Sequence, residues 1–171
     1  MNLQSTDFEL FDVPSAFAQD AAQLDARWKD LQRQLHPDKF AAEGAVAQRV
    51  AMQWSARINE AYRRLKDPVR RAAYLCELNG APIDAERNTA MPADFLMQQM
   101  ELREALDDAA DAATLEGVVI QAQALQRELL AQLAHQTDER ADWPAAAQTV
   151  RALMFLDKLA TEVERKRATL D

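Results

Sequence analysis

Apolar side chains recur at intervals of three and four residues along most of the chain, and this spacing limits its fold more than any other feature. Between positions 20 and 36 the large apolar residues are Leu24, Trp28, Leu31 and Leu35. Residues at these intervals share one face of an α-helix, whereas a half-buried β-strand would need strict alternation. The chain also has only three Gly and six Pro in 171 residues, too few for the many tight turns of a β-protein. The sequence therefore predicts an all-α fold.

Capping and helix-breaking residues predict the ends of the first two helices. A short apolar opening from Phe8 to Val13 predicts a helix of one or two turns before Pro14. Asp20 is expected to cap the second helix, because its side chain can accept hydrogen bonds from the first free N–H groups. Pro37 is expected to end that helix, because the residue before a proline is displaced from the α region.

Periodicity resumes in a long third helix, expected from about Glu43 to Lys66. Its expected inner face consists of Val50, Trp54, Ile58, Ala61 and Leu65. Asp67 followed by Pro68 is typical of a helix cap and first turn, so a fourth helix should begin there. It should end where Leu78 meets Asn79 and Gly80.

The second half of the chain predicts three further helices. Pro92 should start one that runs to about Ala109, and a second should cover about 114–135. The third should run from the segment 142–144 to about Thr169. Short loops between them predict an up-down-up bundle. We therefore expect a first domain at 1–78, a linker at 79–91, and a C-terminal bundle at 92–171.

The net charge of −8 lies entirely in the second half. Residues 1–78 hold eleven basic and eleven acidic residues, whereas residues 79–171 hold nine and seventeen. Nucleic-acid binding depends on neutralising phosphates, so an acidic second half argues against that partner.

Several features favour a soluble cytoplasmic protein. Cys76 is the single cysteine and cannot form an internal disulfide, which fits a reducing compartment. The first seven residues lack the basic and apolar regions of a secretory signal. No run approaches the length of apolar sequence that a membrane-spanning helix needs.

His36, Pro37 and Asp38 lie between the second and third predicted helices. The simplest interpretation is a helix stop with a capping aspartate. A rigid proline corner would also expose the Asp38 carboxylate to a partner's arginine. Lys29 and Arg33 should point to solvent on the second helix and, with Lys39, could form a basic strip. An ordinary solvated face would explain the same three residues.

The first half resembles the J domain of DnaJ-type co-chaperones. The resemblance rests on LQRQLHPDKF at 31–40 and INEAYRRLKDPVRRAAY at 58–74, and it covers about residues 6–78. It implies a helical hairpin whose loop docks on an ATP-hydrolysing chaperone of the heat-shock-seventy class and stimulates its ATPase. The implied chaperone-binding residues are His36, Pro37, Asp38, Lys29, Arg33 and Lys39. Leu35 stands where many J domains have Tyr, at a packing position outside the loop.

The fifth predicted helix has two faces with different character. Phe95, Leu102 and Leu106 share one face and should be core. A second face mixes large apolar and acidic side chains: Leu96, Met97, Met100, Glu101, Glu104 and Asp108. Exposed apolar side chains beside charges often mark an interaction surface. On the seventh helix, Phe155 lies to one side of the core face. Packing of Leu96, Met97, Met100 and Phe155 against the first domain is an alternative that the helical pattern leaves open.

The segments FLMQQMELREALD at 95–107 and TVRALMFLDKL at 149–159 resemble the C-terminal domain of the HscB family. These are the J-domain co-chaperones of iron–sulfur cluster assembly, and with the J domain the resemblance covers nearly the whole chain. It implies an L-shaped protein that binds the scaffold protein IscU and delivers it to the chaperone HscA. The implied scaffold-binding residues are Leu96, Met97, Met100, Glu101, Glu104, Asp108 and Phe155. Met100 and Asp108 stand where relatives often have Leu and Glu, so affinity could differ. No N-terminal cysteine metal site like that of some eukaryotic relatives is present.

Two other functions are alternatives to this interpretation. An enzyme would have to use His36, Asp38, Cys76 or His135 as its metal ligands or nucleophile, and the chain has no glycine-rich phosphate loop. We therefore expect no enzyme activity and no cofactor. A J protein with a different client remains the alternative, although the glycine/phenylalanine-rich and cysteine-rich segments usual in general J proteins are missing.

Overall fold

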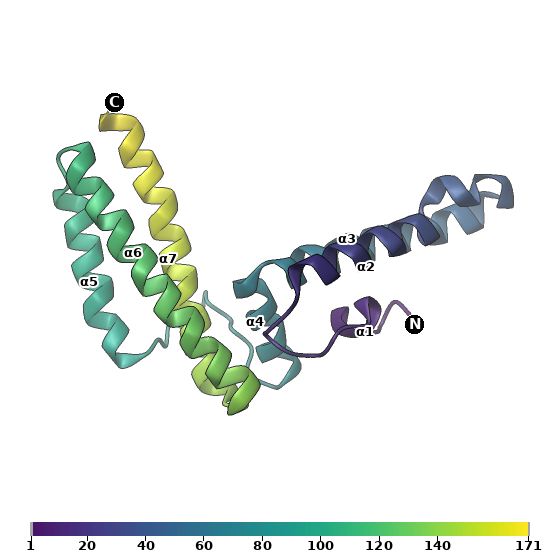
Figure 1. The fold of residues 1–171 in the computed structure, drawn as a ribbon, viewed down its shortest axis with the longest axis horizontal. Coiled ribbons are helices and arrows are strands. Elements are labelled where there is room, and N and C mark those ends of the chain that lie inside the picture. The colour runs from purple at the N-terminus through teal and green to yellow at the C-terminus, as the bar shows by residue number, and fades with distance from the viewer. Residues whose placement is uncertain (1, 171) are drawn as a thin grey trace. The chain divides into compact units, whose positions relative to one another are not determined.

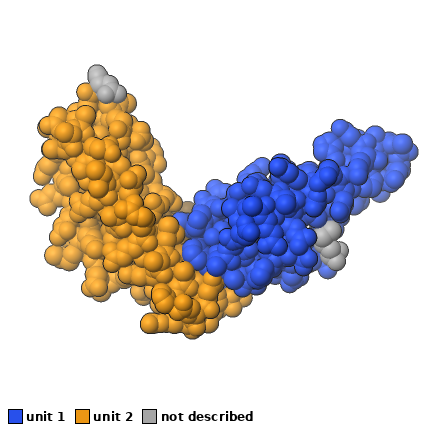
Figure 2. Space-filling view, viewed as in Figure 1, with its two compact units in different colours: residues 1–75 blue, residues 76–171 orange. Residues whose placement is uncertain are grey.

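The computed structural model describes residues 2–170, and every regular element in that range is a helix (Figure 1). The predicted all-α fold is therefore confirmed. The chain divides into two compact units, residues 1–75 and residues 76–171 (Figure 2). The division falls within the helix α4, and the segment at 79–91 belongs to the second unit.

The first unit is built on a long helical hairpin. The short helix α1 (Asp7–Phe11) precedes α2 (Ala21–Leu35), and α2 packs along α3 (Ala45–Lys66). A 3₁₀ helix, η1 (Pro37–Glu43), joins the two long helices. The helix α4 (Pro68–Leu78) follows α3 directly.

The predicted caps are present. The Asp20 carboxylate accepts hydrogen bonds from the backbone N–H groups of Ala22 and Gln23, at 2.9 and 3.3 Å. The Asp67 carboxylate likewise accepts from Val69 and Arg70, at 2.9 and 3.1 Å. These bonds satisfy N–H groups that have no partner inside the helix.

Two expectations for the third helix were wrong. It begins at Ala45 instead of Glu43, because residues 37–43 form the 3₁₀ helix and Gly44 takes a φ of +101° that favours glycine. Val50, expected on the inner face, is 46% exposed. Among the described residues, α1 forms side-chain hydrogen bonds with α3 at Arg57 and Arg64, more than a turn further along, so Val50 lies beyond the part that α1 covers.

Polar and aromatic contacts close the seam between α2 and α3. The Trp28 ring stacks on Tyr62 with centroids 4.9 Å apart, and the Trp28 indole N–H donates to Asn59 at 2.9 Å. The Asp25 carboxylate accepts from both Lys66 Nζ and the Tyr62 hydroxyl at 2.6 Å. These two hydrogen bonds, with Lys66 the larger influence, lower the pKa of the Asp25 carboxyl. The seam therefore holds the two helices in one register through directional bonds.

A buried carboxylate attaches α1 to α3. The Asp7 side chain is fully buried and accepts from Arg57 Nη1 at 2.8 Å and from Arg64 Nε at 2.6 Å. The Asp7 backbone N–H donates to the hydroxyl of Tyr74 on α4 at 3.0 Å, so α1 is also hydrogen-bonded to α4. A buried charge is tolerated only when it is paired and hydrogen-bonded, so these partners are essential to this arrangement.

The second unit is a three-helix bundle, as predicted. It consists of α5 (Ala93–Asp108), α6 (Ala112–Ala134) and α7 (Trp143–Leu170), which pack against one another (Figure 1). Five residues of η2 (His135–Glu139) form a π-helical turn after α6. Apolar side chains of all three helices fill the core, among them Leu102, Leu115, Leu133, Leu153 and Leu159.

Polar contacts fix the C-terminal end of α5 and the start of α6. Asp111 and Thr114 form a reciprocal capping box at the start of α6, directly after α5. The Lys166 ammonium on α7 donates to the backbone carbonyls of Leu106 and Asp107 in the last turn of α5. A cation at a helix C-terminus also opposes the negative end of the helix dipole.

The segment before α5 is held by one buried arginine. Arg151 on α7 is 5% exposed, and its guanidinium donates to the carbonyls of Ile83 at 2.9 Å and Ala90 at 3.1 Å. Ile83 itself is buried. The segment is therefore packed on the bundle instead of extending freely into solvent. Cys76 is also buried, and burial raises the pKa of its thiol to about 11.

The Asp7→Asn variant tests the buried carboxylate. Loss of the charge would leave the guanidinium groups of Arg57 and Arg64 facing a neutral amide, with side chains only 16% and 29% exposed. We expect the free energy of unfolding of the first unit to fall by about 2–3 kcal/mol, somewhat below the cost of breaking a fully buried pair. Urea unfolding followed by tryptophan fluorescence measures it.

The matched control is Glu9→Gln, which removes an exposed carboxylate from the same helix. It should change the unfolding free energy by less than about 0.5 kcal/mol. Equal stability of the two variants would contradict an essential role for the Asp7 cluster.

Candidate partner-binding surfaces

The His36–Pro37–Asp38 corner follows directly from the end of α2. His36 has extended backbone angles and ends α2, and Pro37 and Asp38 begin the 3₁₀ helix. The Asp38 backbone N–H donates to Nδ1 of His36 at 3.2 Å. A nitrogen that accepts carries no proton, so a neutral ring in this arrangement has its N–H at Nε2. The corner is thus fixed by its own backbone and imidazole.

The two polar side chains of the corner face solvent. The side chain of His36 is 54% exposed and that of Asp38 is 90% exposed. The Asp38 carboxylate lies 3.5 Å from His36 Nδ1, and its remaining acceptor positions are open. An exposed carboxylate on a rigid corner is suited to a bidentate bond with an arginine of another molecule.

The predicted basic residues near the corner are all exposed. Lys29 and Arg33 lie on the outer face of α2, and Lys39 lies in the 3₁₀ helix. Arg33 forms an ion pair with Asp30 one turn earlier, at a site where its own side chain is 74% exposed. Such a surface pair contributes little and can exchange for a partner's carboxylate.

The second predicted surface lies on the outer face of α5. Leu96, Met97 and Met100 are 52, 65 and 68% exposed, among the largest apolar exposures in the described residues. Glu101, Glu104 and Asp108 are exposed beside them. Met100, Glu104 and Asp108 line one shallow depression of about 440 Å³, which also includes Gln99, Arg103 and Asp107. By contrast Phe95, Leu102 and Leu106 are buried, so the helix has the two faces that its sequence predicts.

Phe155 on α7 is connected to this surface through Arg103, which lines the depression. It is half-buried, and the edge of one ring meets the face of the other between Phe95 and Phe155, with centroids 5.8 Å apart. The Arg103 guanidinium lies over the Phe155 ring, 5.5 Å from its centroid, and forms an ion pair with Glu162. Arg103 was not predicted from the sequence. Its position four residues before Asp107 on α5 gave no sign that it would reach across to α7.

The described residues were compared with the requirements of a metal cluster and of a membrane-spanning helix. Among residues 2–170, no group of three or more His, Cys, Asp or Glu side chains is placed to hold a metal ion. None of the helices in that range has the length and apolar character needed to cross a bilayer.

Comparison with known proteins decides the family. Residues 91–164 match the family described as the HSCB C-terminal oligomerisation domain. The co-chaperone protein HscB homologue of Burkholderia multivorans is 48% identical over 166 residues, which is 95% of this chain and 94% of the relative. The chain belongs to the HscB family of co-chaperones.

Solved structures of HscB proteins share the fold. The chaperone HscB of Vibrio cholerae is 40% identical, with a TM-score of 0.82 over 98% of this chain and all of that one. The human co-chaperone HscB is 26% identical, with a TM-score of 0.88 over 99% of this chain and 86% of that one. The family resemblance seen in the sequence and the predicted helical architecture are therefore both confirmed.

Proposed function

We propose that this HscB-family chain stimulates the ATPase of an HscA-type chaperone and delivers an IscU-type iron–sulfur scaffold protein to it. The first unit acts as a J domain and meets the chaperone through His36, Pro37 and Asp38. The second unit holds the scaffold on the outer face of α5 together with Phe155. The chain contributes binding and positioning and performs no chemistry on the scaffold.

The observation that most supports the chaperone contact is the exposure of Asp38 on a rigid corner. Its carboxylate is available without prior rearrangement, so little conformational entropy is lost when a partner's arginine binds it. Lys29 and Arg33 on α2 and Lys39 in the 3₁₀ helix are exposed in the elements that meet at the corner, and their positive charge would steer an acidic chaperone surface toward it.

The observation that most supports the scaffold contact is the exposure of three large apolar side chains next to carboxylates. Burial of Leu96, Met97 and Met100 in an interface would remove apolar surface from water. Glu101, Glu104 and Asp108 would then lie at the rim, where charges govern specificity more than affinity. An apolar centre with a charged rim is the usual organisation of a specific protein interface.

Delivery follows from having both surfaces on one chain. When the chaperone and the scaffold are bound together, the scaffold's encounter with the chaperone's substrate site becomes intramolecular. The effective concentration then exceeds the free concentration of either partner. The proposed role of the chain is to keep the scaffold at a high effective concentration near the chaperone's substrate site when ATP hydrolysis closes that site.

The Asp38→Asn variant tests the chaperone contact. It keeps the size of the side chain but loses the charge, and a charge-assisted hydrogen bond is worth ~1.5–3 kcal/mol. We expect stimulation of the chaperone's ATPase to fall by about tenfold or more, while calorimetric binding of the scaffold is unchanged. Glu43→Gln removes a carboxylate from the other end of the same 3₁₀ helix and should stimulate normally. Normal stimulation by Asp38→Asn would rule out the proposed J-domain contact.

The triple variant Leu96→Ala/Met97→Ala/Phe155→Ala tests the scaffold contact. Isothermal titration into cluster-free scaffold should show binding by the unaltered chain and a loss of about a hundredfold or more in affinity for the variant. Ile120→Ala, which removes an apolar side chain that is 59% exposed on α6, is the control and should bind normally. Absence of binding by the unaltered chain would leave the chaperone contact standing and would indicate a different client.

A further inference from the structure

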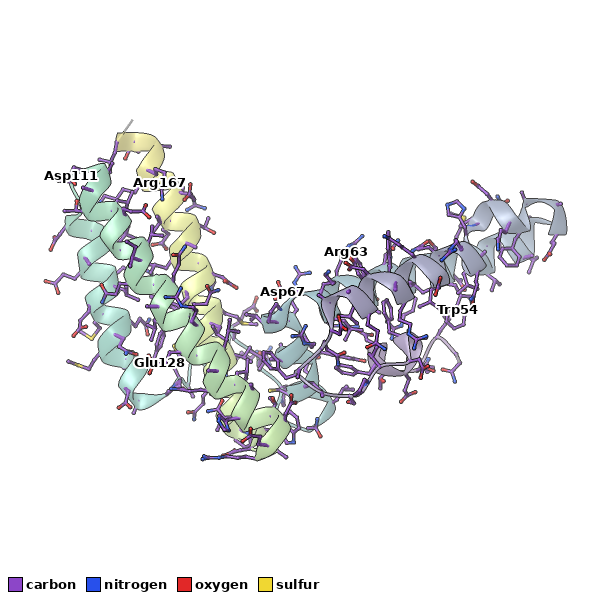
Figure 3. The ribbon with its side chains drawn as sticks, viewed as in Figure 1. Trp54, Arg63, Asp67, Asp111, Glu128 and Arg167 are labelled. Carbon is purple, nitrogen blue, oxygen red and sulfur yellow. The ribbon has the colours of Figure 1, made fainter. Side chains whose placement is uncertain are left out.

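A shallow, open depression lies where the C-terminal end of α3 meets α4, at the end of the helical hairpin away from the His36–Asp38 corner. It has a volume of about 530 Å³ and is lined by Tyr62, Arg63, Lys66, Asp67, Pro68 and Arg70. Figure 3 shows Arg63 and Asp67 at the same end of α3. Three of the six side chains are basic and one is acidic.

The charges in this depression are not balanced. The Asp67 carboxylate is engaged by the backbone N–H groups of Val69 and Arg70, which form the cap of α4. Lys66 is paired with Asp25 on α2 at 2.6 Å. The side chains of Arg63 and Arg70 are exposed, and neither forms an ion pair within the described residues. Two guanidinium groups therefore remain without a counter-charge on one small surface.

The walls between these two arginines suit a carboxylate-bearing segment. Tyr62 and Pro68 provide apolar surface, and the Tyr62 ring is fixed by its stack on Trp28. A guanidinium binds a carboxylate with two parallel N–H bonds, and two such groups on one surface can hold two acidic side chains. Asp25 and Asp67 already accept hydrogen bonds, Asp25 from Lys66 and Asp67 from the cap of α4, so the unpaired charge of the depression is predominantly positive.

The Asp25–Lys66 ion pair links the depression to α2, which carries part of the proposed chaperone-binding strip. Lys66 contacts Asp25 directly and is the main cause of the lowered pKa of that carboxyl, to which the charge of Lys29 also contributes. Lys29 follows Asp25 by about one turn of α2, and Lys66 on α3 pairs with Asp25 at 2.6 Å. The Asp25–Lys66 pair therefore lies between Lys29 on one side and the depression that holds Arg63 and Arg70 on the other.

We propose that Arg63 and Arg70 bind carboxylates of an acidic segment of the same ATP-driven chaperone that docks on the His36–Asp38 corner. The inference rests on the proposed function, since it extends the docking surface of that partner. The two arginines contribute affinity and association rate, whereas the corner triggers hydrolysis. Electrostatic contacts remote from a trigger act in this way.

The test compares Arg63→Glu/Arg70→Glu with the unaltered chain in the chaperone ATPase assay, without scaffold. At low ionic strength we expect the variant to need about a tenfold higher concentration than the unaltered chain for half-maximal stimulation. The maximal stimulated ATPase rate should be the same for both. Added salt should weaken the unaltered chain more than the variant, because the variant has lost the attractive charges. Arg87→Glu/Arg127→Glu makes the same charge change at two exposed sites of the second unit and should leave the half-maximal concentration unchanged.

The neutral variant Arg63→Gln/Arg70→Gln keeps the test valid if the glutamates disturb the fold, which thermal unfolding would reveal. It should show a smaller rise in the half-maximal concentration, in the same direction. The inference would be overturned if a folded variant had an unchanged half-maximal concentration, whether its maximal stimulated ATPase rate was unchanged or lower. The Asp38→Asn variant distinguishes failure of this inference from failure of the proposed function. Normal ATPase stimulation by Asp38→Asn would contradict the proposed function itself.

Discussion

The seam between α2 and α3 is the interaction on which the proposed chaperone-binding surface depends. Trp28, Asn59 and Tyr62 hold the two helices in one register, and Asp25 and Lys66 close the same seam with a charged pair. Pro37 then forces the chain out of α2 at a fixed point, so the position of Asp38 is set by the hairpin beneath it. Directional bonds matter here because few side chains on α2 are fully buried. A corner on a loosely packed hairpin would lose its preorganisation.

Contacts between residues a few positions apart could be predicted from the sequence, whereas contacts between residues far apart in the sequence could not. The caps at Asp20 and Asp67 and the two faces of α5 depend on residues a few positions apart, so a helical pattern reveals them. The buried Asp7 is paired with arginines at least fifty positions away, and nothing in the sequence marks that pairing. The contacts of Arg151 could not be predicted either, because its hydrogen-bond acceptors are backbone carbonyls that no side-chain pattern identifies.

The same division explains what was predictable about the candidate surfaces. Residues on one helix, such as Met100 and Glu104, were grouped from their spacing, and the structure places them around one depression. Arg103 was missed because its contacts with Phe155 and Glu162 depend on how α5 and α7 pack. The molecule carries two exposed surfaces with different chemistry: a charged corner and an apolar patch with an acidic rim. In the proposed function, neither surface serves delivery unless a single chain carries both.

The most direct test of that claim mixes two damaged chains. One carries Asp38→Asn and the other carries Leu96→Ala/Met97→Ala/Phe155→Ala, so each surface is present but never on the same molecule. The measured quantity is the scaffold concentration that gives half-maximal chaperone ATPase activity. The unaltered chain should lower this concentration by about tenfold or more through tethering, and the mixture should leave it near the value without co-chaperone. A mixture as effective as the unaltered chain would contradict delivery by tethering.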